Sequence, residues 1–502
     1  MTTARITLDP SFQVGPVRRR TFGSFVEHLG RCVYTGIYDP GHPSADEDGF
    51  REDVIELVKD LGVSTVRYPG GNFVSGYRWE DGIGPVEERP TRLDLAWHSS
   101  DPNTVGVDEF MRWAKKADVE PMMAVNLGTR GVTEALDLLE YCNVPGGSKL
   151  SDLRREYGDE NPYKVKMWCL GNEMDGPWQV GHKSAEDYGR LAAETARAMR
   201  MMDPDLELVA CGSSSPEMET FSAWEYEVLS QTYELVDYIS AHAYYWERDG
   251  DLASFLASGV EMDNFVDDVI ATADAVRAKG KYKKRINISF DEWNVWYQKR
   301  AESVPPKGDD WPIAPVLLED NYTVADAIVV GGLLISLLRH TDRVHSASLA
   351  QLVNVIAPIM TEPGGRVWKQ TIFYPFAQAS NLASGVVLQP VISSPTYETE
   401  RYGEVPVLDA VATWDEESGI TTVFAVNRSM TDSMDLEIDL RAAGHQVLEA
   451  TSYSSTDPYW AASADDDSSV VPVANETASV SEGIVKMELP PVSWNVIRLA
   501  RA

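Results

Sequence analysis

Two short segments of this chain each carry an apolar run into a glutamate. Glu173 lies in Leu170-Gly-Asn-Glu-Met-Asp175, and Glu292 lies in Ile288-Ser-Phe-Asp-Glu-Trp-Asn294. Cleavage of a glycosidic bond commonly uses two carboxyl groups, because one protonates the departing oxygen while the other attacks or stabilises the electron-poor sugar carbon. If both segments are strand ends of one barrel, Glu173 and Glu292 meet at its mouth. The pair therefore predicts a two-carboxylate active site.

Short β-rich runs alternate with longer amphipathic stretches over most of the chain. This alternation is typical of a parallel sheet with crossover helices, and about eight such strands close a TIM barrel. Strands are expected at residues 21–29, 63–70, 120–127, 164–170, 206–211, 238–244, 286–291 and 347–353. A sequence resembling a capping box, Ser184-Ala-Glu-Asp187, then starts a helix after the fourth strand. Glu173 therefore falls in a strand-to-helix connection, on the catalytic face of such barrels.

The pattern changes beyond residue 382, where the helical periodicity fades. Alternating β-type runs follow at residues 405–413, 420–426, 436–440, 484–489 and 493–499. The predicted fold is thus α/β, a (β/α)8 barrel over residues 18–382 with a jelly-roll-like all-β sandwich over residues 383–502. Two connections, 76–103 and 298–321, are too long to be turns and are expected to overhang the barrel mouth.

The composition limits the partners that this chain can have. Its 502 residues carry a formal charge of −34, which argues against nucleic acid or an anionic membrane as a partner. The four cysteines show no CxxC spacing, so buried thiols in a reducing compartment are expected, with no metal and no cofactor. The start lacks the apolar core of a signal peptide, and the most apolar run, 327–338, is too short to span a bilayer. A cytoplasmic protein is predicted.

Polar side chains gather at the ends of the predicted strands. A single one is equally well explained by a structural hydrogen bond or ion pair, but together they favour a sugar-binding cleft, because ligand groups of such barrels cluster there. They are Glu27, His28, Arg67, Asn72, Asn126, Asn172, Glu173, His242, Tyr244, Glu292, Asn294, Gln351 and Asn354.

The same strand ends carry a family resemblance. The matching stretches are Phe22-Gly-Ser-Phe-Val-Glu27-His28, Arg67-Tyr-Pro-Gly-Gly-Asn72-Phe73, Gly171-Asn-Glu-Met-Asp-Gly-Pro-Trp178, Ala241-His-Ala-Tyr244 and Asp291-Glu-Trp-Asn-Val-Trp296. The chain resembles the intracellular bacterial α-L-arabinofuranosidases of glycoside hydrolase family 51, across the barrel and into the sandwich. The order of the motifs is the family's order.

The resemblance implies a role for each group. Glu173 would be the general acid/base and Glu292 the nucleophile, with retention of configuration through a covalent arabinosyl-enzyme. The furanose hydroxyls would be held by Glu27, Asn72, Asn172 and Gln351, while His242 and Tyr244 would orient the carboxylates. Residues 1–17 would add a strand to the sandwich, and a homo-oligomer, commonly a hexamer, would form.

Elementary chemistry agrees with these roles. Glu173 must be protonated near neutral pH, which an apolar or carboxylate-rich surrounding favours. Glu292 must stay ionised, and Arg67 is the cation that can hold it so. The alternative for Glu292 is an ion pair that holds the barrel together.

Several neighbouring residues have competing interpretations. Trp178 and Trp296 are expected near the substrate, although a Trp is more often part of a core. A turn role after two glycines competes for Asn72. Asn126, Asn294 and Asn354 are expected to be structural by default. Asp291 should alternate away from the mouth of a period-two strand and be a buried structural carboxylate.

The resulting hypothesis is an exo-acting enzyme that releases terminal α-L-arabinofuranosyl units from short arabino-oligosaccharides. One alternative keeps the scaffold and changes the sugar, as in a β-xylosidase or β-glucanase, because loop shape selects the sugar. Another is a sugar-binding barrel without turnover, which would have little need for both Glu173 and Glu292.

Overall fold

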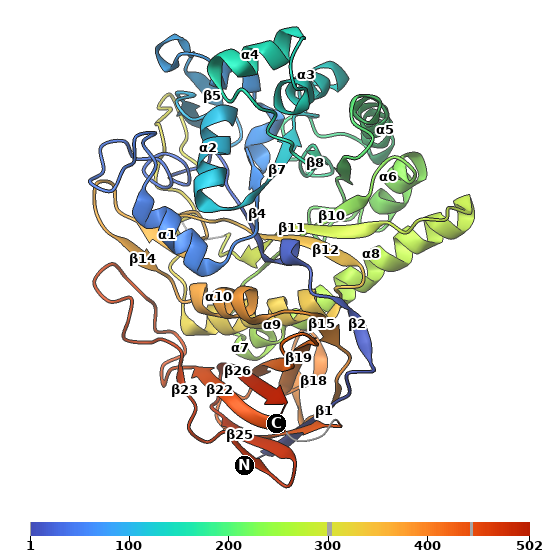
Figure 1. Ribbon diagram of the computed structural model, residues 1–502, viewed down its shortest axis with the longest axis vertical. Coiled ribbons are helices and arrows are strands. Elements are labelled where there is room, and N and C mark those ends of the chain that lie inside the picture. Colours follow the sequence, from blue (N-terminus) through green and yellow to red (C-terminus); the bar gives the residue numbers. More distant parts are fainter. Residues whose placement is uncertain (1, 299–303, 442–444, 502) are drawn as a thin grey trace.

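A closed barrel of eight parallel strands forms the centre of the molecule (Figure 1). The computed structural model describes residues 2–298, 304–441 and 445–501. Around the barrel the strand order is β10-β11-β12-β3-β4-β7-β8-β9. The strands are β3 (Gly23–Phe25), β4 (Thr65–Tyr68), β7 (Glu120–Val125), β8 (Met167–Leu170), β9 (Glu207–Ala210), β10 (Tyr238–Tyr245), β11 (Asn287–Val295) and β12 (Val344–Leu349). Each predicted strand overlaps one of them, so the predicted barrel is confirmed.

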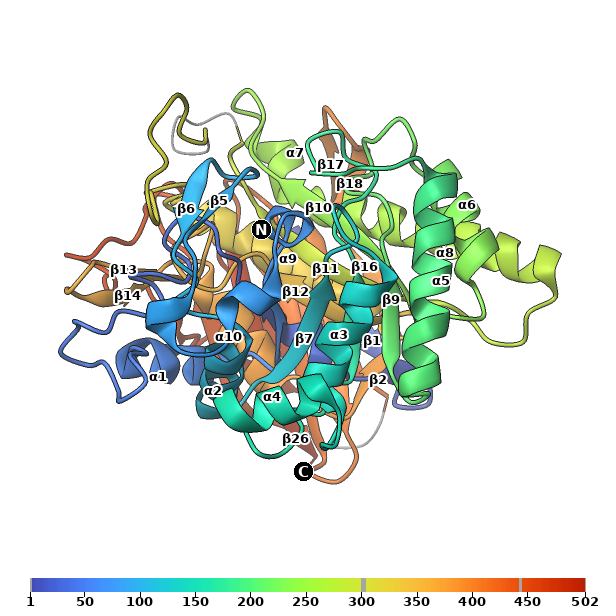
Figure 2. The ribbon, with the colours of Figure 1, turned by 90° about the horizontal axis from the view of Figure 1, so that it is seen from above.

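Helices surround this barrel, as Figures 1 and 2 show. They are α1 (Glu52–Leu61), α2 (Val107–Ala117), α3 (Val132–Asn143), α4 (Lys149–Tyr157), α5 (Ala185–Met202), α6 (Ala223–Thr232), α7 (Leu252–Leu256), α8 (Ser258–Gly280), α9 (Val324–Arg339) and α10 (Phe373–Leu382). Ser184 caps α5 by accepting a hydrogen bond from the Asp187 amide at 3.1 Å. The apolar run 327–338 lies in α9, which contacts β11 and β12 of the barrel and also the C-terminal domain. Within the described part of the chain, no helix is long and apolar enough to cross a bilayer.

The C-terminal domain consists mainly of two packed sheets. One has the order β16-β1-β21-β25-β24 and the other β2-β15-β19-β20-β26-β22-β23. Their strands are β1 (Thr2–Leu8), β2 (Gln13–Pro16), β15 (Val386–Leu388), β16 (Val391–Ser393), β19 (Leu408–Asp415), β20 (Ile420–Asn427), β21 (Met434–Leu440), β22 (His445–Tyr453), β23 (Val473–Ala474), β24 (Ser479–Ser481), β25 (Ile484–Leu489) and β26 (Ser493–Arg501). Buried side chains of both sheets, such as Ile6 and Leu408, form one apolar cluster. The predicted sheet-rich C-terminal domain is therefore confirmed.

The N-terminal segment belongs to these sheets. β1 pairs in parallel with β21, and β2 pairs with β15. The division of the chain at 17/18 and 382/383 stays a prediction. Two short hairpins complete the C-terminal half, β13 (Ile359–Thr361) with β14 (Val367–Lys369) and β17 (Thr396–Thr399) with β18 (Gly403–Pro406).

The two long connections meet above the barrel. The first contains the 3-10 helices Trp79–Gly82 and Val86–Glu88 and the hairpin of β5 (Arg92–Asp94) and β6 (Ser99–Asp101). The Ser100 amide donates to the carbonyl of Pro312 in the second at 3.0 Å, and the rings of His98 and Trp311 stack with centroids 3.7 Å apart. Residues 299–303 of the second connection lie outside the described residues.

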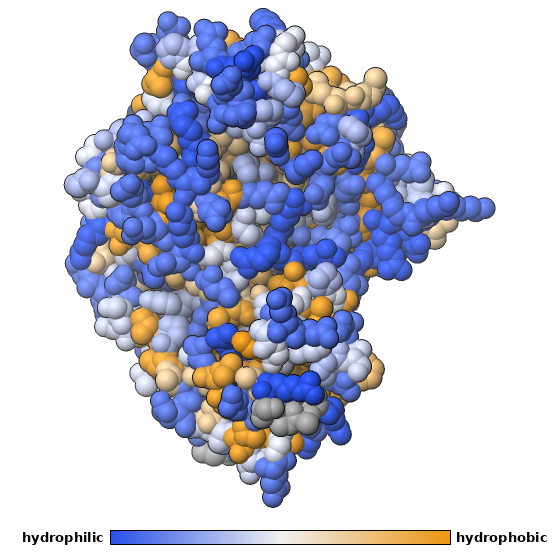
Figure 3. Space-filling view, viewed as in Figure 1, coloured by the Kyte–Doolittle hydropathy of each residue, from blue (hydrophilic) through white to orange (hydrophobic). Residues whose placement is uncertain are grey.

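The surface and the buried cysteines agree with the composition. The face in Figure 3 is mostly hydrophilic, as a net charge of −34 leads one to expect. All four cysteines are buried, as predicted, and none forms a disulfide within the described residues. They are Cys32, Cys142, Cys169 and Cys211.

Candidate active site

Glu173 lies on a tight turn directly after β8. Gly171 has a φ of +94° and Glu173 a φ of +44°, and the Gly176 amide donates to the Glu173 carbonyl at 2.8 Å. A left-handed backbone costs a residue other than glycine about 1–3 kcal/mol. Such a cost persists where surrounding contacts impose the geometry, and here the turn brings the Glu173 side chain into the wall of a cavity at the barrel mouth.

Glu292 reaches the same cavity from inside β11, and a β-bulge places it there. Ser240 opposes Ser289, whereas His242, two residues later, opposes Glu292 three residues later. The extra residue interrupts the alternation of side chains. The prediction that this strand ends at Asp291 is therefore wrong, since β11 continues to Val295. Asp291 is buried as expected, but its carboxylate is directed to His242 beneath the mouth, 2.8 Å from Nε2.

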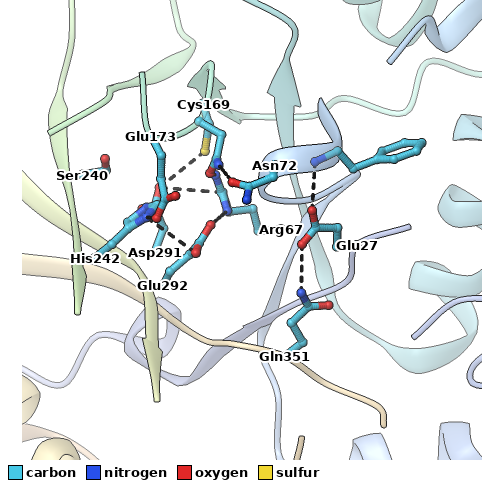
Figure 4. Close-up of polar contacts among 12 residues, drawn as sticks. Glu27, Arg67, Asn72, Cys169, Glu173, Ser240, His242, Asp291, Glu292 and Gln351 are labelled. Carbon is cyan, nitrogen blue, oxygen red and sulfur yellow. Dashed lines mark hydrogen bonds and ion pairs between the residues drawn. The ribbon is translucent and has the colours of Figure 1, made fainter. Parts of the chain in front are cut away.

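The two glutamates face one another across a single cavity of about 510 Å³. A carboxylate oxygen of each and a ring nitrogen of His242 lie within 4.8 Å of one another, and Figure 4 shows the three side chains converging. Retaining glycosidases hold their carboxyl groups about 5–5.5 Å apart, and inverting ones about 6.5–9.5 Å apart. The observed spacing lies below the inverting range and fits direct attack on the sugar.

Glu292 is held by two donors. Arg67 Nη1 lies 2.8 Å from Glu292 Oε1, and the Tyr244 hydroxyl donates to Oε2 at 2.8 Å. Arg67 is itself buried, and its Nη2 donates to the Asn172 side chain at 2.6 Å. The arrangement therefore fixes both oxygens of the Glu292 carboxyl group.

Glu173 has the surroundings of an acid. Burial, and then the negative charge of Glu292, raise the pKa of Glu173 above its ordinary value. Its two oxygens meet His242 Nδ1 and Trp178 Nε1, each at 2.8 Å. These two hydrogen bonds act to lower the pKa of Glu173, so burial and the charge of Glu292 outweigh them.

His242 connects Glu173 to Asp291 through its two ring nitrogens. Burial alone would lower the pKa of His242, but Glu292, Asp291 and Glu173 together raise it well above its ordinary value. A protonated imidazole donates from both nitrogens, which suits its 2.8 Å contacts to Glu173 and Asp291. Glu173, His242 and Glu292 are also close enough together to hold a metal ion. A protonated imidazole has no lone pair to offer a metal, so this donor set suits a hydrogen-bonded network better.

A second polar group lies on the opposite side of the mouth. Glu27 accepts hydrogen bonds from the Phe73 amide, the Trp97 indole and the Gln351 side chain, each at 2.9 Å. Burial raises the pKa of Glu27 to about 8. A Cβ atom on Gly70 would lie 2.3 Å from Glu27 Cγ, so only glycine fits there. The Pro-Gly-Gly sequence after β4 thus permits the close approach of Glu27.

The predicted site residues divide into two layers. Those that line the cavity are Glu27, Asn72, Glu173, Trp178, Tyr244, Glu292, Trp296 and Gln351. Arg67, Asn172 and His242 lie beneath them, where their observed partners are protein side chains. Asn72 lines the cavity and also begins the short 3-10 helix Asn72–Ser75. The binding position and the turn position, which were expected to be alternatives, therefore occur together.

The structure also locates the two tryptophans expected near the substrate and the three asparagines expected to be structural. The Trp178 side chain is half exposed, and the Trp296 ring meets the Tyr244 ring edge-on at 5.0 Å. The three asparagines expected to be structural bond to nearby protein atoms: Asn126 to the Tyr77 carbonyl, Asn294 to the carbonyls of Ala350 and Ile356, and Asn354 to the Arg31 carbonyl.

Comparison with known proteins identifies the family. An α-L-arabinofuranosidase 1 domain matches residues 57–264, and an α-L-arabinofuranosidase C-terminal domain matches residues 291–493. An intracellular exo-α-(1→5)-L-arabinofuranosidase from Streptomyces lividans is 58% identical over the whole chain and 76% of its own length. A solved family 51 α-L-arabinofuranosidase from Bifidobacterium longum is 50% identical with a TM-score of 0.96 over 99% of both chains. The chain belongs to glycoside hydrolase family 51.

A second relative bears on specificity within family 51. An exo-α-(1→6)-L-arabinofuranosidase from Bifidobacterium longum is 57% identical, and the match covers 99% of this chain and 97% of the relative. The (1→5) and (1→6) relatives are thus almost equally similar to this family 51 chain. Overall identity therefore does not select the linkage.

Other lining residues of this family 51 site carried no motif in the sequence. They are Ser214, Ser215, Pro216, Glu217, Trp246, Arg248 and Glu261, from the loops after β9 and β10 and from α8. Trp246 and Arg248 follow the predicted strand 238–244 closely, which is the one sequence signal that could have found them. Asp175 fixes the loop after β9, because its carboxylate accepts from the Ser214 amide at 2.9 Å and the Ser214 hydroxyl at 3.0 Å.

Removing the buried cation should destabilise the family 51 site. Arg67→Met is expected to lower the free energy of unfolding by about 3–5 kcal/mol, because Glu292 and Asp291 would stay buried without their cation. Urea unfolding measures the change. The matched control is Arg190→Met, whose exposed ion pair with Glu186 should matter little. An Arg67→Met protein as stable as the wild type would contradict this account of the ion pair.

Proposed function

We propose that this family 51 hydrolase acts by double displacement on terminal α-L-arabinofuranosyl units, with Glu173 as acid/base and Glu292 as nucleophile. The observation that carries the proposal is the spacing of the two carboxyl groups, whose oxygens lie within 4.8 Å in one cavity. The contact of Glu292 with the Arg67 guanidinium and the raised pKa of Glu173 support the assignment of the two roles.

The reaction has two steps. In the first, a Glu292 oxygen bonds to the anomeric carbon while the bond to the leaving oxygen breaks and Glu173 gives that oxygen its proton. In the second, Glu173 takes a proton from water as the water oxygen bonds to the anomeric carbon, and the bond to Glu292 breaks. Both residues return to their starting states, and the sugar keeps its anomeric configuration.

The remaining lining residues hold the sugar in this proposal. The side chains of Glu27, Asn72 and Gln351 pair with furanose hydroxyls, because carboxylate and amide groups bind hydroxyls in fixed directions. Asn172 completes this set from beneath, and Arg67, His242 and Tyr244 hold the carboxyl groups. Trp178 and Trp296 provide the aromatic surface at the mouth.

Short arabino-oligosaccharides inside the cell are the substrates that we infer. The relatives from Streptomyces lividans and Bacillus subtilis, 58% and 53% identical, are both named intracellular exo-α-(1→5)-L-arabinofuranosidases. The family resemblance also supports a homo-oligomer, for which a hexamer is the form to test. Light scattering after size-exclusion chromatography measures the mass directly.

A panel of aryl glycosides tests the function. We expect the wild-type protein to hydrolyse an aryl α-L-arabinofuranoside faster than the corresponding β-xyloside or β-glucoside. Proton NMR of the first-formed sugar should show the same anomeric configuration as the substrate. Equal or faster hydrolysis of the xyloside or glucoside would favour a change of sugar on the same scaffold. Binding of arabinose without turnover of any glycoside would favour a non-catalytic barrel.

A further inference from the structure

One side of the cavity is a charged wall that the two-carboxylate mechanism does not use. We define this charged wall as Glu217, Trp246, Arg248 and Glu261, all of which line the cavity together with Glu173. Arg248 Nη2 lies 2.7 Å from Glu217 Oε1, and the Arg248 guanidinium lies over the Trp246 ring at 4.2 Å. The wall therefore combines oriented donors, acceptors and an aromatic ring.

The order of the barrel strands places this wall on the leaving-group side. Glu27, Gln351 and Asn72 follow β3, β12 and β4, which are neighbours in the barrel. The wall lies on the loops after β9 and β10 and on α8, across the mouth from those residues. Figure 4 shows Glu27 and Gln351 on one side of the site and Glu173 and His242 on the other.

The position of the acid fixes the direction of the substrate. Glu173 follows β8, which neighbours β9, and Asp175 ties the turn after β8 to the loop after β9 through Ser214. A general acid must lie next to the oxygen that departs. The leaving group therefore extends from Glu173 toward the loop that carries Glu217, whereas the terminal sugar lies toward Glu27.

The C-terminal domain holds this wall in place. Arg401, in the turn between β17 and β18, places Nη2 at 3.4 Å from Glu217 and 3.2 Å from Glu261. The Tyr402 hydroxyl donates to Glu261 at 3.1 Å, and the Arg401 amide donates to the Ser254 hydroxyl at 3.2 Å. In Figure 2 the β17–β18 hairpin lies near α7, and β17 contacts α7. A hairpin of the second domain thus braces one end of the barrel cavity.

The wall suits a neutral sugar better than a charged ligand. Its two carboxylates, Glu217 and Glu261, are matched by Arg248 and Arg401, so the cluster has no net charge. The Arg248 side chain is 32% exposed and lines the cavity. Sugar hydroxyls both donate and accept, so they can bind to such ion pairs while a ring covers an aromatic face.

We propose that the charged wall binds the first sugar unit on the leaving-group side of the scissile bond, and that Arg401 is its positioning residue in the C-terminal domain. The proposal rests on the proposed function. In this proposal the wall determines which oligosaccharide the enzyme prefers. The almost equal identity to the (1→5) and (1→6) relatives does not assign that preference.

The test compares a substrate that has sugar on the leaving-group side with one that does not. The ratio of kcat/KM for α-1,5-arabinotriose to kcat/KM for 4-nitrophenyl α-L-arabinofuranoside is measured for the wild type, Glu217→Gln and Arg401→Ala. Both variants are expected to lower this ratio about tenfold, mainly by raising KM for arabinotriose, because contacts to charged groups are lost. Arg401→Lys, which keeps the charge, is expected to restore part of the ratio.

Arg441→Ala is the matched control, because Arg441 is an exposed arginine of the same domain that pairs with Asp439 at 3.5 Å. It should keep the wild-type ratio. Equal losses on both substrates, or an unchanged ratio in Glu217→Gln and Arg401→Ala, would overturn the charged wall as a sugar site. The wild type is measured first, so a failure of the proposed function is visible separately, as the absence of turnover on either arabinofuranoside, and would overturn both.

Discussion

Glu292→Gln is expected to lower kcat for an aryl arabinofuranoside by roughly 10⁵-fold, because a nucleophile held in place is worth an effective molarity of that order. The amide keeps the size of the side chain but removes the anion that Arg67 and Tyr244 hold at 2.8 Å. A good leaving group cannot compensate, since the missing step is bond formation at the anomeric carbon. Steady-state rates on the aryl substrate measure the effect.

Covalent labelling provides the control for this variant. A mechanism-based inhibitor should add its mass to the peptide that contains Glu292 in the wild-type protein and in Glu173→Gln, which still has the attacking carboxylate. Glu292→Gln should gain no mass at that peptide. Label on another residue, or substantial turnover by Glu292→Gln, would reassign the nucleophile.

The barrel could be predicted from the sequence because its strands are continuous apolar runs. In a parallel barrel both faces of each strand are covered, so β8 and β12 have almost no exposed residues. The location of the functional residues could then be predicted as well, because the residues that follow every strand lie at one edge of the barrel. This is why Glu173 and Gln351, far apart in sequence, were expected at one mouth.

The bulge in β11 could not be predicted in this way. A regular strand sends neighbouring side chains to opposite faces, so Asp291 was expected to point away from the site. The bulge leaves Asp291 and Glu292 both in contact with His242, at 2.8 Å and 3.6 Å. The register of β10 against β11 decides this, and one strand's sequence does not encode it alone.

The charged wall was missed for a different reason. Its residues come from two loops and a helix of the barrel, and it is braced by a hairpin from the other domain, so their proximity depends on tertiary structure. The hairpin was missed too, because β17 and β18 are polar and largely exposed and lack the apolar alternation that marked β19 and β20. The sequence pattern thus located the catalytic pair but not the substrate contacts beyond it.

Glu173→Ala is expected to separate two kinds of substrate. Turnover of arabino-oligosaccharides should fall about 10²–10⁴-fold, the usual contribution of a positioned acid, whereas an activated aryl arabinofuranoside should lose far less in bond cleavage. An alkoxide needs a proton to depart, and a nitrophenolate does not. Added azide should partly restore the rate by attacking the covalent intermediate in place of water. Equal losses on both substrates would show that Glu173 acts in some other way.

The pH dependence gives an independent test of the same group. Burial and the charge of Glu292 raise the pKa of Glu173, so its acid form persists to higher pH than for an exposed glutamate. The protonated form is the active one, so kcat/KM for oligosaccharides should fall as pH rises through this pKa. In Glu173→Ala that alkaline decline should be absent. A decline that survived the substitution would place the titrating acid elsewhere, and the raised pKa of Glu173 would then be a consequence of burial without a catalytic role.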